Sequence, residues 1–143
     1  MNLKRFHRGW LNYMNKIEIN SIESVIFFTL YICAQDEIIA DEEIAQLAAE
    51  IPILQKLYLD IYGELINEDL SLLIKDIAKK LRPREKFIGK QITEIEKNTF
   101  SKLITDPKIQ DIALLISRHA ASADGFHKKE SYKFKYWAKT WGL

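Results

Sequence analysis

Carboxylate side chains recur at two matched points of this chain, 88 positions apart (124 − 36 = 88). The first set is Asp36, Asp41 and Glu43, and the second is Asp124 and Glu130. At each point an apolar helical pattern ends at an Asp, a short hinge follows, and a Glu opens the next predicted helix. Clustered carboxylate oxygens are the ligands that Ca²⁺ and Mg²⁺ prefer. These five residues are therefore predicted to bind Ca²⁺ or Mg²⁺, and weakly, because the first hinge lacks the ligand order of an EF-hand.

The same residues also have a purely structural interpretation. Asp36 and Asp124 could accept hydrogen bonds from the free N–H groups of the helix that follows, while Glu43 and Glu130 reach back toward those groups. Asp and Gly are ordinary turn residues, and Gly125 suits the left-handed position that ends a helix. The repeat alone does not decide between a hinge used twice and a site shared by two hinges.

Composition indicates one soluble globular domain over residues 1–143. Apolar residues make up 48% and charged residues 29% of the chain. The most apolar run, 22–34, is shorter than the roughly 20 residues that a bilayer span needs, so we expect no direct membrane span. No signal-peptide pattern opens the chain, and the single cysteine, Cys33, excludes an intrachain disulfide. These features favour a reducing cytoplasm.

Charge is distributed unevenly along the chain. Residues 1–35 sum to +2, residues 36–70 to −9 and residues 71–143 to +8, which gives the net charge of +1. An acidic field directly after the first hinge would attract cations or a basic protein partner and repel phosphate.

Helical periodicity predicts an all-α fold, a compact bundle of about seven to eight helices. Asn20 and Glu23 form a capping-box pattern, Pro52 is expected to stop a helix, and Asp106-Pro107 is a strong start signal. The two most apolar segments, 22–34 and 107–123, should lie at the centre. Each leads into an acidic hinge and a second helix, which suggests a pseudo-two-fold duplication of helical hairpins. The expected helices are 3–17, 20–34, 41–51, 54–66, 67–81, 84–97, 107–123 and 128–141.

The second hinge resembles that of a known family. Ala123-Asp124-Gly125 followed six residues later by Glu130, after a helix opened by Thr105-Asp106-Pro107, is similar to the TerB family of tellurite-resistance proteins. The order of elements matches over essentially the full chain. The first hinge departs from the family pattern, because Glu37 stands where the family usually has Gly.

This resemblance implies an all-helical cytoplasmic protein associated with resistance to tellurite or general stress. It also implies an acidic surface cluster that binds divalent cations, and a scaffold role with membrane-bound protein partners that would keep the protein peripheral to the inner membrane. Direct reduction of tellurite is disfavoured, because Cys33 lies in an apolar helix and a buried thiol is unreactive.

Other constellations give weaker signals. His7, His119 and His127 show no metal-ligand spacing, and no nucleophile and base are gathered, so we expect a protein that is not an enzyme. Lysines interleaved with aromatic residues in 128–141 are explained by a solvated helix face, and no nucleic-acid partner is expected. The rival hypothesis is a metal-independent interaction module that docks a basic partner through residues 36–70. A metal-dependent hydrolase is the third alternative.

Overall fold

The computed structural model of the chain describes residues 17–33, 41–63, 72, 74–76, 92, 94–122 and 128–142. The described part is all-helical and contains no strand, as predicted. Residue 72 and residues 74–76 are also helical, whereas the predicted helix at 3–17 lies outside the described residues. The number of helices and the internal duplication therefore stay predictions. The principal helices are α2 (Ile22–Cys33), α3 (Asp41–Tyr62), α5 (Glu94–Leu103), α6 (Pro107–Ser122) and α7 (Lys128–Thr140).

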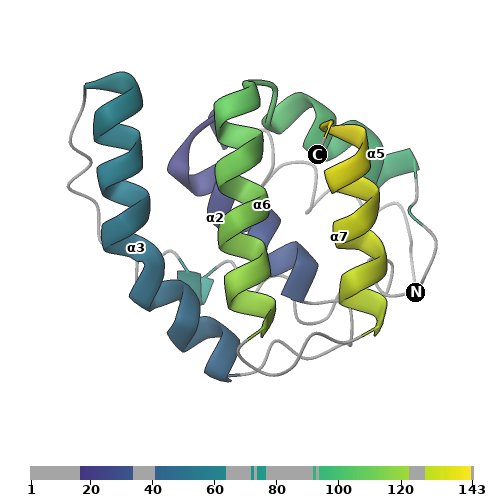
Figure 1. Cartoon of the computed structure of the whole chain (residues 1–143), viewed down its shortest axis with the longest axis horizontal. Helices are drawn as coiled ribbons and strands as arrows, with labels where there is room; N and C mark the ends of the chain where they lie inside the picture. Colours follow the sequence, from purple (N-terminus) through teal and green to yellow (C-terminus); the bar gives the residue numbers. More distant parts are fainter. Residues whose placement is uncertain are drawn as a thin grey trace.

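Helix α2 forms the centre of the core. All of its residues except Glu23 are buried, and it packs most extensively on α6. In Figure 1, α6 lies between α3 and α7, and α2 crosses behind it. Phe28 of α2 packs edge to face against both Phe100 of α5 and Trp137 of α7, with ring centroids 5.4 and 6.1 Å away. The prediction of a central position is confirmed for Ile22–Cys33, whereas α6 packs on α2 with one face and leaves the other exposed.

The start of α2 differs from the predicted capping box. Ser21, rather than Asn20, is the N-cap: its Oγ accepts a hydrogen bond from the Ser24 amide at 3.1 Å. Asn20 has a left-handed backbone with φ of 58°, and its Oδ1 accepts hydrogen bonds from the amides of Thr105 and Asp106 at 2.8 and 3.0 Å. The Asn20 side chain therefore joins the start of α2 to the connection between α5 and α6.

The predicted starts of the last two helices are confirmed. The Lys108 amide donates to Asp106 Oδ1 at 2.9 Å, which makes Asp106 the cap of α6, and Pro107 occupies the first helical position. Helix α7 begins at Lys128 and ends at Thr140. Trp137 is fully buried, and Phe134 and Trp141 are partly buried against the core.

The predicted break at Pro52 is wrong. Helix α3 runs through Pro52 without interruption for 22 residues and ends at Tyr62. The two helices expected at 41–51 and 54–66 are therefore a single helix as far as Tyr62. Pro52 is exposed, whereas Leu47, Ile51, Leu54 and Tyr58 are buried on both sides of it. Burial of these side chains, at about 1.5–3 kcal/mol each, outweighs the roughly 3 kcal/mol that an interior proline costs. The helix bends midway along its length (Figure 1), as helices do at proline.

The helix predicted at 84–97 is also displaced. Helix α5 begins at Glu94 and continues to Leu103, beyond the predicted end, and residues 84–91 lie outside the described part. Its core face consists of Glu96, Thr99, Phe100 and Leu103. Two of these four residues are polar, so the spacing of apolar residues alone does not reveal the buried face of this helix. No helix among the described residues is long and apolar enough to span a bilayer.

Candidate functional site

The structure describes the five predicted cation ligands only in part. Asp36 and Asp124 lie outside the described residues. Asp41 is the first residue of α3 and Glu43 lies in its first turn, while Glu130 lies in the first turn of α7. For these three residues the structure places the backbone alone. Whether the five carboxylates converge on one ion therefore stays a prediction.

The helix ends that flank the two hinges lie at one end of the molecule. The last turns of α2 and α6 and the first turns of α3 and α7 all lie at the lower end of the view in Figure 1. First turns present unpaired N–H groups and a partial positive charge, to which carboxylates are attracted. Among the described residues there is no group of three or more His, Cys, Asp or Glu arranged to hold a metal ion.

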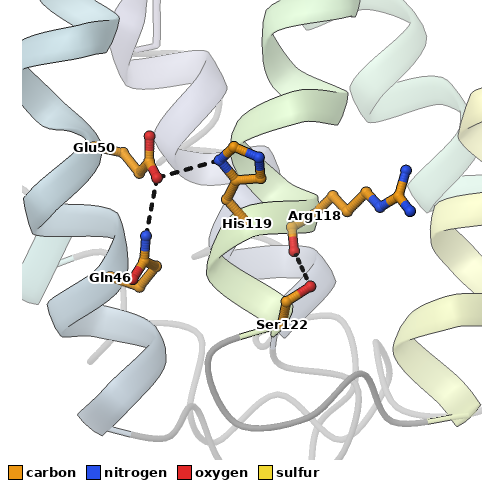
Figure 2. Close-up of polar contacts among 5 residues, drawn as sticks. All are labelled: Gln46, Glu50, Arg118, His119 and Ser122. Atoms are coloured by element: carbon orange, nitrogen blue, oxygen red, sulfur yellow. Dashed lines mark hydrogen bonds and ion pairs between the residues drawn. The ribbon is translucent and has the colours of Figure 1, made fainter.

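A polar contact joins α3 to α6 (Figure 2). Glu50 Oε1 accepts a hydrogen bond from Gln46 Nε2 at 2.9 Å and lies 3.2 Å from His119 Nδ1. An ionised carboxylate only accepts hydrogen bonds, so this contact requires the proton on Nδ1 of His119. The Glu50 side chain is 9% exposed and that of His119 is 49% exposed. The sequence shows no metal-ligand spacing for His119, and no sequence signal pairs two residues 69 positions apart.

A second polar contact lies in the last turn of α6. Ser122 Oγ donates a hydrogen bond to the Arg118 carbonyl oxygen at 2.7 Å, which satisfies an acceptor near the end of the helix. The Arg118 guanidinium points away from Glu50 (Figure 2). It therefore leaves the Glu50 carboxylate to Gln46 and His119.

A buried charge pair in the core was not predicted from the sequence. Lys133 Nζ of α7 donates a hydrogen bond to Glu96 Oε1 of α5, and both side chains are at most 1% exposed. Lys133 Nζ also lies 5.4 Å from the centroid of the Tyr31 ring. Trp137 Nε1 donates to the Tyr31 hydroxyl at 3.4 Å. The polar atoms of α2, α5 and α7 therefore meet inside the aromatic core.

Burial determines how the groups of this network titrate. It lowers the pKa of the Lys133 ammonium below its usual value, and the hydrogen bond and charge of Glu96 oppose that effect only in part. It also raises the pKa of the Tyr31 hydroxyl well above 10, and the nearby Glu96 charge adds to the rise. Because these groups are buried, the network holds helices together and presents no surface at which a solute could bind.

Comparison of the chain with protein-family models, curated proteins and solved structures gives no match. The resemblance to the TerB family therefore stays a prediction from the sequence.

Proposed function

We propose that this chain is a non-enzymatic helical scaffold of the TerB type that responds to divalent cations and contributes to tellurite or stress resistance. Its ligands are Asp36, Asp41, Glu43, Asp124 and Glu130, and its ion is Ca²⁺ or Mg²⁺. In this proposal the protein works in the cytoplasm. It reaches the inner membrane only through a protein partner.

One observation carries the proposal. The helix ends from which both hinges depart, and to which both return, lie at the same end of the molecule (Figure 1). This arrangement supports a shared site, whereas hinges at opposite ends would have excluded one. An ion bound by both hinges would join the first turns of α3 and α7. Since α3 already contacts α6 through Glu50 and His119, that link would fix α3 relative to the rest of the bundle.

Thermal unfolding with and without cations tests this proposal. A ligand that binds only the folded chain raises its stability by about 1.4 kcal/mol when its concentration is ten times the Kd. We expect the Tm to rise in millimolar Ca²⁺ or Mg²⁺ and to return in chelator. Asp36→Asn and Asp124→Asn should each abolish the rise.

Asp60→Asn is the matched control. It removes one negative charge, as the hinge variants do, but from an exposed position near the other end of α3. It should leave the rise unchanged. The proposal is wrong if neither ion raises the Tm, or if the two hinge variants respond like Asp60→Asn.

A second candidate is a metal-independent module that docks a basic partner through residues 36–70. The continuity of α3 favours it, because Asp41–Tyr62 forms one helix at the edge of the molecule and carries five acids against one base. Chelator separates the two candidates. A partner docked by charge alone stays bound when the cation is removed, whereas a cation-dependent scaffold releases its partner.

A further inference from the structure

Two helices of this chain carry opposite charges of equal size. Helix α3 has five acids, Asp41, Glu42, Glu43, Glu50 and Asp60, and one base, Lys56, which gives −4. Helix α7 has five bases, Lys128, Lys129, Lys133, Lys135 and Lys139, and one acid, Glu130, which gives +4. The net charge of +1 therefore conceals a strongly dipolar molecule.

The two charged helices lie on opposite flanks. In Figure 1, α3 and α7 lie at opposite sides of the molecule, with α6 between them. One charged side chain on each is already engaged inside the molecule, because Glu50 contacts His119 and Lys133 pairs with Glu96. Among the charged side chains that the structure describes as exposed, Glu42 and Asp60 against Lys56 leave α3 at −1, and Lys135 and Lys139 leave α7 at +2.

The described exposed residues define both surfaces. We call Glu42, Ile53, Leu59 and Asp60 of α3 the acidic flank, and Tyr132, Lys135 and Lys139 of α7 the basic flank; all of them are exposed. At 100° per residue, positions 42, 53 and 60 share one face of α3, and positions 132, 135 and 139 share one face of α7.

Each flank also has an apolar component. Ile53 is 51% exposed on the acidic flank, and Tyr132 is 56% exposed on the basic flank. Exposed apolar residues beside charges of one sign are typical of surfaces that dock a partner of the opposite sign. Lys56 is the one base of α3, and it is also exposed. It reduces the negative charge of this helix face without changing its sign.

We propose that the acidic flank of one copy docks on the basic flank of a second copy of this chain. The contact uses different surfaces on the two copies, so a pair keeps one free basic flank on the first copy and one free acidic flank on the second. Such a head-to-tail interface closes into a ring or continues as a chain. This inference does not require cation binding, and it names the basic partner that the second candidate function leaves open.

The oligomeric mass as a function of ionic strength tests the proposal. Exposed charges interact over a Debye length of about 30 Å at 0.01 M salt and about 3 Å at 1 M. Sedimentation velocity and light scattering should show that the weight-average mass at least doubles with protein concentration at low salt. The mass should return to that of the monomer at high salt. The measurements are made in chelator, so that a failed cation site does not affect them.

Charge reversal identifies the surfaces. Glu42→Lys with Asp60→Lys reverses the exposed acids of α3, and Lys135→Glu with Lys139→Glu reverses the exposed bases of α7. Each double variant brings like charges together in the proposed contact and should stay monomeric at low salt. An equimolar mixture should associate again, because each reversed flank then meets a complementary one.

The control is Lys108→Glu with Arg118→Glu, which moves the net charge as far as the α7 variant does but changes exposed positions of α6. It should associate like the unchanged protein. A wild-type chain that stays monomeric at low salt overturns the proposal. So does a mixture of the two folded reversal variants that stays monomeric, with folding checked by circular dichroism.

Discussion

At the scale of single residues, the buried Glu96 and Lys133 pair is the strongest determinant of local stability that the structure adds. Moving two charges out of water costs several kcal/mol each, and mutual attraction recovers that cost only while both partners are present. Loss of one partner leaves the other charge buried, whereas loss of both leaves an apolar site. The single and the double substitutions should therefore have very different effects.

We predict that Lys133→Met lowers the free energy of unfolding by about 3–5 kcal/mol, because it leaves the Glu96 carboxylate uncompensated in the core. Glu96→Leu combined with Lys133→Met should recover most of that loss. Urea denaturation followed by circular dichroism measures both. The control is Lys97→Met, which removes the exposed pair with Glu94 and should cost less than about 1 kcal/mol. A double variant as unstable as Lys133→Met would contradict this account.

Ionisation of Tyr31 should make the free energy of unfolding depend on pH in the alkaline range. An unfolded tyrosine ionises near pH 10, whereas burial raises the pKa of folded Tyr31 well above that value. Between these two values the folded chain holds a proton that the unfolded chain has lost, so the free energy of unfolding falls as the pH rises. This contribution is complete below about pH 10. Lys133, whose pKa is lowered, acts in the opposite direction only up to about pH 10.4.

We therefore predict that, as the pH rises above about 10, the free energy of unfolding falls less in Tyr31→Phe than in the unchanged chain. Urea denaturation at a series of pH values measures the difference. The difference between the two proteins gives the contribution of Tyr31, because the other five of the six tyrosines are present in both. Equal slopes in the two proteins would show that Tyr31 ionises in the folded state like an exposed tyrosine.

At the scale of helices, the sequence predicts interiors better than ends. Ile22–Cys33 and Pro107–Ser122 were predicted within about a turn, because an all-round apolar helix and a cap such as Asp106 are local signals. The cap of α2 was misassigned by one residue, because Asn20 makes its hydrogen bonds to residues 85 and 86 positions away. The continuity of α3 could not be predicted either, since it depends on burial against α2 and α6 rather than on Pro52 itself.

Pro52 provides a direct test of that explanation. Its side chain is exposed, so Pro52→Ala removes no core contact while it restores a backbone N–H within the helix. We predict that the free energy of unfolding rises by about 1–3 kcal/mol, because Ala is favoured over Pro in helix interiors by about 3 kcal/mol and the unfolded chain gains some entropy. Urea denaturation measures the change. A loss of stability would mean that α3 needs its bend to fit the bundle.

At the scale of the whole molecule, the candidate site depends on long-range placement that the sequence only partly encodes. The carboxylate repeat predicts which residues belong to the two hinges, and helix periodicity predicts which helices flank them. Neither predicts that the ends of α2, α3, α6 and α7 lie together, because that follows from the packing of α2 on α6. The pair of Glu50 and His119 joins α3 to α6, and the pair of Glu96 and Lys133 joins α5 to α7, so both pairs also depend on how distant helices pack.

The same packing predicts a gradient of local stability across the bundle. Helix α2 is buried along nearly its whole length and α6 packs against it, whereas α3 lies at the edge and has an exposed outer face. Amides in the core exchange with solvent only through global unfolding, while peripheral helices also open locally. We therefore predict that hydrogen exchange is slowest in α2 and α6 and faster in α3, at matched intrinsic rates. Equal protection of α3 and α2 would show that the edge helix unfolds only with the core, and that no separate motion of α3 is available for a cation to restrain.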